Sequence, residues 1–227
     1  DDRLNALEHN ASVTLSGTAQ DLVPGSTTSN TAVGRNLSVS LNGQTYTATV
    51  QADGSWRTQV SATDITALAE GSAQVNVSFA GFYGNTGTAS RAFAVDTQAP
   101  TLSLTTPADI LLSASELANF SMAYSSTDSA SMPVVSVQIV NALNLVQTGL
   151  SLSTANNAVT GDLSSLSDGV YTLEVSSADA AGNVSLRSQV ITIDKSAPTA
   201  TIVLADSALR AGETSLVTIT FSEAVIG

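Results

Sequence analysis

Apolar and polar residues alternate over short runs of this chain, and the alternation predicts a series of β-strands. In Ala73–Phe79, for example, every second residue is apolar, and the residues between them are amides or a hydroxyl. A period of two residues is typical of a strand with one buried face. Helical periodicity is weak, and only Ala62–Ala69 and Asp162–Ser167 are expected to hold a single helical turn.

The alternating runs recur at similar spacing, with turn residues between them. The first ninety-five residues contain seven such runs, near 4–8, 12–19, 37–42, 45–51, 55–60, 73–80 and 88–95. The next hundred contain seven more, near 101–105, 117–124, 134–141, 145–152, 158–163, 170–177 and 185–193. Turn signals such as Asn42-Gly43 and Asp53-Gly54 separate them, because these residues tolerate positive φ. Seven short strands per hundred residues predict an immunoglobulin-like (Ig-like) β-sandwich.

An internal repeat divides the chain. The segment Val95–Thr101 reads Val-Asp-Thr-Gln-Ala-Pro-Thr, and Ile193–Thr199 reads Ile-Asp-Lys-Ser-Ala-Pro-Thr, 98 residues later. A repeat of this length suits a whole small domain rather than one turn of a solenoid. We therefore expect an all-β chain of tandem seven-stranded Ig-like sandwiches, with domains at 1–95 and 96–193. Residues 194–227 are expected to be the first two strands of a third, incomplete domain.

The third repeat has two predicted strands, near 199–204 and 215–222. Its apolar residues Val217, Ile219 and Phe221 need a facing sheet, because two strands alone are marginally stable in water. Either the sequence ends within a domain or this segment borrows a partner, and the first explanation is the simpler. The abrupt start at Asp1-Asp2, with no signal peptide, is likewise expected of a piece of a longer chain.

Charge and composition exclude several classes of protein. The chain has seven Lys and Arg residues and nineteen Asp and Glu residues, which gives a formal charge of −12. The basic surface of a nucleic-acid-binding protein is therefore absent. There is no Cys for disulfide or thiol chemistry, and no apolar run is long enough to span a membrane. The acidic surface fits a soluble extracellular protein. It either supplies oxygen ligands for divalent cations or serves solubility alone.

Several short motifs of the first repeat occur in an order that resembles a known family. They are Leu41-Asn42-Gly43-Gln44-Thr45-Tyr46, Ala52-Asp53-Gly54-Ser55-Trp56 and Leu68-Ala69-Glu70-Gly71. With them, residues 1–95 resemble the bacterial Ig-like repeats of giant secreted adhesins of the RTX and biofilm-associated (Bap-like) type. The second repeat resembles the family mainly at Asp179–Asn183 and in its Asp-x-x-Ala-Pro linkers. Phe221–Val225 resembles a related repeat type.

The resemblance implies a stalk on the bacterial cell surface. Such a stalk is a secreted array of repeats that holds a terminal binding domain away from the cell, often with calcium at the module junctions. The partners implied are neighbouring repeats of the same chain, and a glycan or host surface reached through other domains. Cell adhesion or biofilm formation is the implied role, without enzymatic activity.

Strand direction predicts where a calcium site would form. In a seven-stranded sandwich, the loops after the second and sixth strands lie at the same end, where the linker also enters. Asp128, Asp179 and the linker residue Asp96 should therefore converge at the first junction, with Asn183 and backbone carbonyls as further ligands. Calcium binds six to eight oxygens, commonly from several carboxylates. Glu70, in the turn before the sixth strand of the first repeat, should reach the same junction.

A parallel set of acids is expected at the second junction, formed by Asp194, Glu223 and Asp168. Its partner loop would lie beyond Gly227, so this site should be incomplete or empty. At the head of the first repeat, the residue aligned with Asp179 is Gly81. That substitution argues against a calcium site there.

Plainer explanations exist for the same residues. Asp179–Asn183 is also a good turn sequence, and Asp168 and Glu70 each precede a glycine as turn residues do. Tyr171 is expected to be a tyrosine-corner residue that bonds back to the backbone. Trp56 is expected in the core rather than as a sugar-stacking surface. The single histidine, His9, lies near no nucleophile and is expected at the surface or in packing.

Three functional hypotheses follow. The first is a calcium-stiffened stalk of a surface adhesin. The second is a module that binds a glycan or host protein, for which an exposed aromatic patch would be evidence, although aromatic residues make up only 4% of the chain. The third is an accessory domain of a secreted polysaccharide-degrading enzyme. Catalysis by the chain itself has little support, because a glycosidase needs two carboxylates flanking a cleft.

Overall fold

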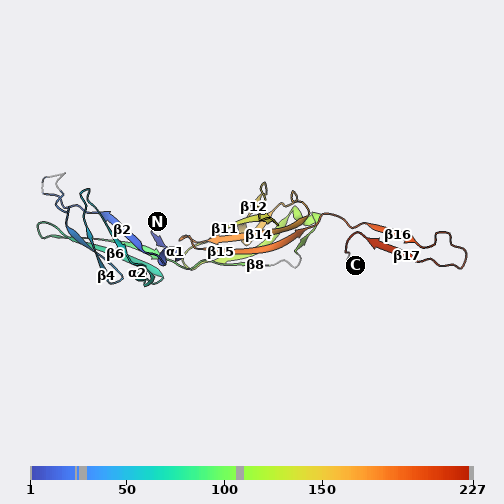
Figure 1. The fold of residues 1–227 in the computed structure, drawn as a ribbon, viewed down its shortest axis with the longest axis horizontal. Helices are drawn as coiled ribbons and strands as arrows, with labels where there is room; N and C mark the ends of the chain where they lie inside the picture. Colours follow the sequence, from blue (N-terminus) through green and yellow to red (C-terminus); the bar gives the residue numbers. More distant parts are fainter. Residues whose placement is uncertain (1, 24, 26–29, 106–109, 225–227) are drawn as a thin grey trace. The chain divides into compact units, whose positions relative to one another are not determined.

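The computed structural model describes residues 2–23, 25, 30–105 and 110–224, most of which lie in strands or the turns between them (Figure 1). The chain divides into two compact units. The first comprises residues 1–103, 125–136 and 175–187, and the second comprises residues 104–124, 137–174 and 188–227. In chain order the strands form a first sandwich, β1–β7, a second sandwich, β8–β15, and a hairpin, β16–β17.

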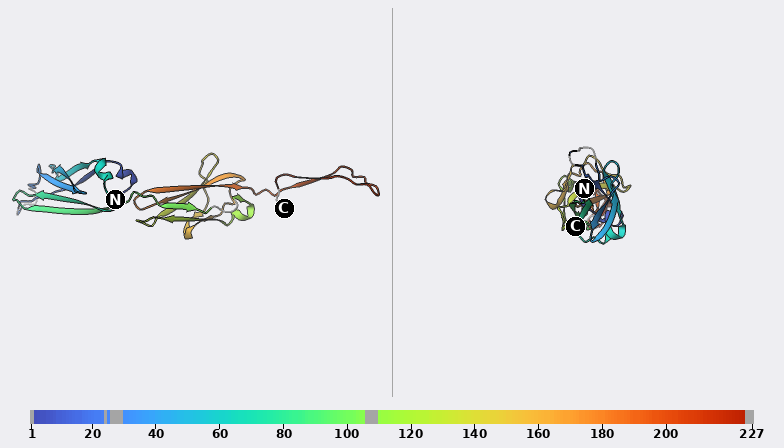
Figure 2. Two further views of the ribbon diagram at one scale, coloured as in Figure 1. Left: turned by 90° about the horizontal axis from the view of Figure 1, so that it is seen from below. Right: turned by 90° about the vertical axis from the view of Figure 1, so that its left-hand side faces the viewer.

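Where the structure describes it, the first sandwich contains seven strands in two sheets, and these strands lie in two layers (Figure 2). One sheet has the order β1-β7-β6-β3-β4, with β1 parallel to β7 and the other pairs antiparallel; the second sheet is the antiparallel pair β2-β5. The strands are β1 (Arg3–Leu4), β2 (Val13–Thr18), β3 (Asn36–Leu41), β4 (Gln44–Thr49), β5 (Ser55–Val60), β6 (Gly71–Ala80) and β7 (Thr86–Val95).

Alternating residues of both sheets form the core of the first sandwich. One cluster joins Leu41, Val60 and Val95, and a second joins Val39, Val50 and Trp56. Trp56 is 7% exposed, so it is a core residue, as the sequence predicts, and offers no surface for stacking a sugar. The indole covers Gly17, where an added Cβ would lie 2.8 Å from the ring, so any larger residue there would collide with it.

The predicted strand at 4–8 is wrong beyond Leu4. Residues Ala6–His9 form the helix α1, because the Asn5 side chain accepts hydrogen bonds from the backbone N–H groups of Leu7 and Glu8. Glu8 completes a capping box by accepting from the Asn5 backbone N–H, 3.1 Å away. The helical turn predicted after Ala62 is confirmed as α2 (Ala62–Thr66), whose N-cap is Ser61.

Within the described residues, the second sandwich contains eight strands in two sheets, of order β12-β13-β10-β8 and β11-β14-β15-β9. The strands are β8 (Thr101–Leu104), β9 (Leu111–Leu112), β10 (Phe120–Thr127), β11 (Val134–Asn141), β12 (Leu152–Ser153), β13 (Ala158–Gly161), β14 (Gly169–Ala178) and β15 (Val184–Ile193). Two short helical segments accompany them, α3 (Ala114–Leu117) and η1 (Ala155–Asn157). The short strand β9 was not predicted, and β12 overlaps the last residue of the strand predicted at 145–152.

The predicted strand at 145–152 is confirmed only in part: Val146 forms an isolated antiparallel bridge with Val140, and Leu152 begins β12, but the residues between them are not in a strand. Asn141 accepts hydrogen bonds from the backbone N–H groups of Leu143 and Leu145, and Asn144 takes a positive φ of 59°. These bonds fold the segment into a turn, because an Asn side chain competes locally with strand pairing. Residues 162–167 likewise form a turn rather than a helix.

Tyr171 confirms the predicted tyrosine corner, since its hydroxyl donates to the backbone carbonyl of Ser167 at 3.1 Å. Removing this hydroxyl would leave a partly buried carbonyl without its partner. We therefore expect Tyr171→Phe to lower the free energy of unfolding by about 1 kcal/mol. Urea unfolding measures this change, with Tyr83→Phe as the control because Tyr83 is exposed. Equal stability of the two variants would contradict the role of the bond.

The hairpin consists of β16 (Ala200–Leu204) and β17 (Val217–Phe221), close to the two strands predicted for the third repeat. Its cross-strand pairs place Ile202 opposite Ile219 and Leu204 opposite Val217. These four side chains share one face, since strand residues alternate between faces, and all four are at least half exposed. The hairpin thus presents an amphipathic two-stranded ribbon.

Candidate metal centre

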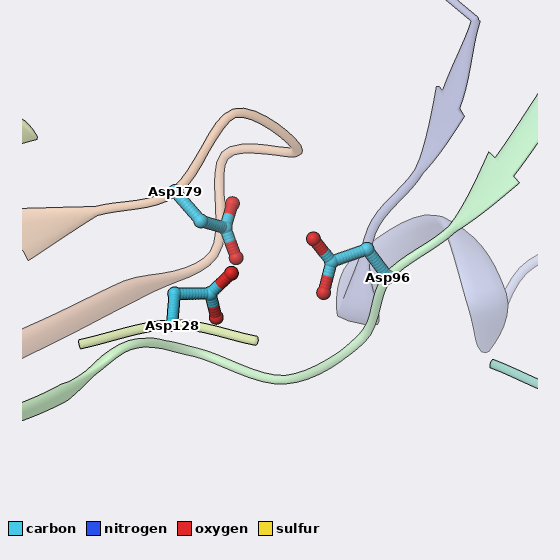
Figure 3. Close-up of side chains that lie close together, drawn as sticks. All are labelled: Asp96, Asp128 and Asp179. Atoms are coloured by element: carbon cyan, nitrogen blue, oxygen red, sulfur yellow. The ribbon is translucent and has the colours of Figure 1, made fainter. Parts of the chain in front are cut away.

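Three aspartates that each follow the last residue of a strand come together in the first compact unit. Asp96 follows β7, Asp128 follows β10 and Asp179 follows β14. One carboxylate oxygen from each lies within 4.8 Å of the others, and the three carboxyl groups point toward one another (Figure 3). We call these residues the aspartate cluster. The convergence agrees with the geometry expected from strand direction.

Asp179 is held by its own loop. Its Oδ1 accepts from the backbone N–H groups of Ala181 and Asn183 at 2.8 and 2.9 Å, and its Oδ2 accepts from the Asn183 side-chain amide at 2.7 Å. Gly182 takes a positive φ of 93°, which closes the turn and explains the glycine. The plainer explanation of this motif as a turn is therefore correct, and the same turn fixes the position of the Asp179 carboxylate.

Asn183 fastens three segments to one another. Its side-chain N–H donates to the Asp96 backbone carbonyl at 2.7 Å as well as to Asp179, and its Oδ1 accepts from the Ala6 backbone N–H at 2.8 Å. Nearby, Asn5 donates to the Ala181 carbonyl at 3.2 Å. Asn183 was expected as a metal ligand; the structure gives its amide a structural role, and metal binding by its oxygen stays a prediction.

Asp128 lies in the loop after β10 and is half-buried. Its Oδ1 accepts from the backbone N–H groups of Ala130 and Ser131 at 2.9 and 2.8 Å. Two such bonds fix the orientation of the carboxyl group before any ion is present. The arrangement therefore resembles that of Asp179, in which the loop backbone pre-positions the side chain.

Asp96 is the least satisfied member of the cluster. Its side chain belongs to a residue only 2% exposed, and its Oδ2 is buried with no hydrogen-bond partner. Burial raises the pKa of Asp96 above its ordinary value, and the charges of Asp179, Asp128 and, more weakly, Glu70 raise it further, against a lowering bond from the Gln98 backbone. A buried carboxylate facing two others is unfavourable unless something neutralises it.

The raised pKa of Asp96 gives a prediction for the metal-free chain. A carboxyl group with a higher pKa when folded than when unfolded binds more protons in the folded state, so the free energy of unfolding falls as pH rises from the ordinary aspartate pKa to the raised one. In chelator, Asp96→Asn should therefore gain stability relative to the wild type as pH rises through that window. Urea unfolding of both proteins at several pH values measures this. A difference in unfolding free energy between the variant and the wild type that does not change with pH would contradict the prediction.

A divalent cation fits the cluster. Two oxygens that each lie about 2.4 Å from one calcium ion can be at most about 4.8 Å apart, which is the limit the three carboxylates meet. The donor set consists of hard oxygens, which suits calcium, magnesium or manganese rather than zinc.

His9 is the single histidine of the chain. Its Nε2 lies 3.1 Å from the Leu68 carbonyl oxygen, as expected for a packing residue.

Glu70 and Asp168 occupy equivalent positions and make equivalent contacts. Glu70 accepts from the Thr97 backbone N–H at 3.1 Å and from the Thr97 hydroxyl, and Asp168 accepts from the backbone N–H of Lys195 at 3.0 Å and the hydroxyl of Ser196. Each acid thus holds the first residues of the linker that follows its repeat. The structure does not bring Glu70 into the aspartate cluster, and metal binding by either acid stays a prediction.

The second predicted set is arranged differently. Asp194 accepts from the Ser196 backbone N–H at 3.0 Å. Glu223 is half-buried, its Oε1 lacks a hydrogen-bond partner, and burial and the neighbouring Asp194 raise its pKa. Asp168 is bound to the linker instead. Within the described ranges, these three residues do not form a three-carboxylate cluster, and their role as ligands stays a prediction.

The loop that begins at Gly81 is closed by the same backbone hydrogen bond as the loop that begins at Asp179. Gly81 donates to the Asn85 carbonyl at 2.8 Å, as Asp179 donates to the Asn183 carbonyl at 3.1 Å. A Cβ on Gly81 would lie 3.2 Å from a carboxylate oxygen of Asp21, which also accepts from the Phe82 backbone N–H at 2.7 Å. Asp21, from the loop after β2, therefore supports this turn in place of a residue-81 side chain. This contact was not predicted from the sequence.

Comparison with known proteins supports the fold. Residues 194–227 match the family model described as a bacterial Ig-like domain. The match supports the resemblance to bacterial Ig-like repeats over these residues, and the all-β Ig-like sandwich fold is confirmed by solved structures of the same architecture. Comparison with curated protein sequences finds no match.

Two solved structures with similar folds are informative. The first is titled "Ca2+-stabilized adhesin helps an Antarctic bacterium reach out and bind ice"; it is 24% identical with a TM-score of 0.51, over 89% of this chain and 49% of that one. The second, of fibronectin(III)-like modules of Clostridium thermocellum CbhA, is 14% identical with a TM-score of 0.51, over 86% of this chain and 90% of that one. The chain spans about half the length of the adhesin structure.

Proposed function

We propose that this chain is part of the stalk of a bacterial surface adhesin, and that calcium held by the aspartate cluster stiffens it. The observation that carries the calcium proposal is the buried Asp96 Oδ2, which has no partner and faces two other carboxylates. The likeness to a calcium-stabilised adhesin supports the adhesin role, which is structural and needs no catalysis. A secreted or cell-surface location follows from it. Along the described chain, no helix is both long and apolar enough to cross a membrane.

In the proposed site, Asp96, Asp128 and Asp179 would hold the ion. Calcium would supply two positive charges and so remove the repulsion among three carboxylates. Asp96 stands at the end of β7, whereas the other two acids stand in loops after β10 and β14, so one ion would cross-link three segments. The segments adjoin at the proposed boundary between repeats 1–95 and 96–193, and the cross-link would therefore stiffen the linker that joins these repeats.

The chain's own contacts prepare the site. Asn183 already ties the Asp96 carbonyl to the Asp179 loop, and Glu70 holds the linker at Thr97. Of the Asp96 carboxylate, Oδ2 has no hydrogen-bond partner, and calcium would complete the arrangement rather than create it. We propose that without calcium the same linker acts as a hinge, because the repulsion among the acids opposes these few hydrogen bonds.

Small-angle scattering tests the proposal. In excess calcium the wild-type chain is expected to show a larger maximum dimension and a narrower size distribution than in chelator, and Asp96→Asn should remove the difference. Asp162→Asn is the matched control, because Asp162 also follows a strand directly but is exposed and outside the cluster. Identical profiles of the wild type in calcium and chelator would contradict the stiffening.

A second function, a glycan- or host-binding module, is favoured by one observation. Phe82 and Tyr83 are 62% and 60% exposed at a loop tip, with ring centroids 5.2 Å apart and the Arg35 guanidinium 5.9 Å from the Phe82 ring. Exposed rings with an adjacent cation are a surface on which sugars stack. Glycan-array binding in chelator, lost in Phe82→Ala, would support this function, and an empty array would count against it.

A further inference from the structure

The two linkers differ at a position that the repeat makes equivalent. Thr97 in the first linker and Lys195 in the second are 98 residues apart, which is the offset of the repeat. Lys195 is the only lysine of the chain, and the first linker, Asp96–Pro100, contains neither Lys nor Arg. The second linker therefore carries a positive charge where the first carries a neutral hydroxyl group.

The Lys195 ammonium reaches the turn that precedes β14. Its Nζ donates to the Leu166 carbonyl at 2.7 Å and lies 3.5 Å from the Ser164 carbonyl. The bond to Leu166 is partly buried, and burial strengthens a hydrogen bond by lowering the local dielectric constant. An ammonium group has three N–H donors and no acceptor, so backbone carbonyls are suitable partners for it. The linker is thus fastened to the turn by a cation of its own.

Asp168 binds the same linker from the side of the turn. Its Oδ1 accepts from the Lys195 backbone N–H and its Oδ2 from the Ser196 hydroxyl, both at 3.0 Å. The ammonium therefore holds the turn through a carbonyl, and the carboxylate holds the linker through an N–H and a hydroxyl. Hydrogen bonds with one charged partner are stronger than those between neutral groups. We call Lys195 and Asp168 the lysine clasp; both residues belong to the second compact unit.

The equivalent carbonyl of the first repeat has a different partner. Leu68 is 98 residues before Leu166, and its carbonyl lies 3.1 Å from Nε2 of His9. His9 belongs to α1, near the start of the repeat, whereas Lys195 belongs to the linker that follows the second repeat. The acid of the clasp is thus present in both repeats, but a linker cation is present only in the second.

The two junctions also differ in their acids. Three aspartates face one another in the aspartate cluster, where a metal ion would neutralise them. Among the described residues, Asp168, Asp194 and Glu223 form no such cluster, and the linker already donates to both carboxylate oxygens of Asp168. The first junction therefore has a prepared position for a metal ion, and the second has one for the ammonium of Lys195.

We propose that the lysine clasp fastens the second linker without a metal ion, so that the two linkers of this chain respond differently to calcium. The clasp is a conformational device built into the linker sequence. It rests neither on the stalk role nor on calcium binding by the aspartate cluster, because its hydrogen bonds are made by the chain itself.

NMR relaxation of the backbone amides tests the proposal on the whole chain, in calcium and in chelator. Lys195 and Ser196 of the wild type should have order parameters of about 0.85, typical of rigid backbone, in both conditions. Lys195→Met keeps a stem of similar length and removes the ammonium, and it should lower both values below about 0.6. Lys195→Arg retains a cationic donor and should keep the values above those of Lys195→Met.

Arg187→Met is the matched control for the loss of one positive charge. Arg187 is an exposed residue of β15 whose guanidinium donates to the adjacent Leu186 carbonyl, so this variant should leave the order of the second linker unchanged. Unaltered amide shifts in β10 and β14 show that the second sandwich is folded in each variant.

Two results would overturn the proposal. One is an order parameter at Ser196 that is the same in Lys195→Met as in the wild type. The other is a wild-type order parameter at Lys195 that rises when calcium is added, because a metal ion would then fasten the second linker. The Thr97 amide reports on the first linker in the same spectra, so a failure of calcium stiffening there is seen separately.

Discussion

In excess calcium, the chain is expected to unfold at a temperature roughly 10–20 °C higher than in chelator. An ion that binds only the folded state adds about 2.7 kcal/mol when its concentration is a hundred times the dissociation constant, and each kcal/mol shifts the midpoint of a small domain by about 4–8 °C. The binding energy is available because Asp96 is buried and its Oδ2 has no hydrogen-bond partner without the ion. The shift should follow the cooperative unit that contains the aspartate cluster.

Two variants make this prediction specific. Asp96→Asn should abolish the calcium-dependent shift, because it removes the carboxylate that completes the site. Asp162→Asn should retain the full shift, since Asp162 is exposed and its hydrogen bonds are with Ser164 rather than with the aspartate cluster. Scanning calorimetry in calcium and in chelator measures both. A wild-type midpoint that is the same in the two conditions would refute calcium binding at this site.

Removing Asp179 should have the opposite effect to removing the charge of Asp96 when no calcium is present. Asp179→Ala would leave two backbone N–H groups and the Asn183 amide without their acceptor in a buried loop. Each hydrogen bond to a charged group contributes about 1.5–3 kcal/mol, and relief of repulsion with Asp96 offsets part of the loss. We expect a net loss of about 2–3 kcal/mol of unfolding free energy in chelator.

Asp96→Asn, by contrast, should be neutral or stabilising by up to about 1 kcal/mol in chelator at neutral pH, because it removes a buried charge whose Oδ2 accepts no bond. Urea unfolding of both variants, with the wild type, gives the comparison. Destabilisation of similar size in the two would mean that the carboxylates act only as structural acceptors. Opposite signs of the change in unfolding free energy for the two variants would distinguish a site prepared for an ion from an ordinary polar loop.

The sequence was sufficient for the arrangement of the site because strand polarity determines where loops meet. Asp96, Asp128 and Asp179 are far apart along the chain, yet each follows a strand end, and alternating strand directions bring those ends together. The repeat also correctly paired Glu70 with Asp168. Their contacts with Thr97 and Lys195 could not be predicted, because a carboxylate in a turn can bond to any nearby amide.

The failures have local causes. Residues 4–8 alternate like a strand, but Asn5 and Glu8 form a capping box, whose Asn-x-x-Glu spacing was visible in the sequence and outweighs the alternation. At 145–152 the Asn141 side chain captured the backbone amides that a strand would have used. The role of Asp21 beneath Gly81 had no signal in the sequence, since the two residues are sixty positions apart and outside the repeat register.

The central claim is that the aspartate cluster binds a calcium ion, and anomalous diffraction from a crystal grown in calcium tests it most directly. We predict an anomalous peak about 2.3–2.6 Å from oxygens of Asp96, Asp128 and Asp179, absent from crystals of Asp96→Asn. A map from a calcium-soaked crystal with no peak among these three carboxylates, or with a water or sodium ion in that place, would contradict the claim.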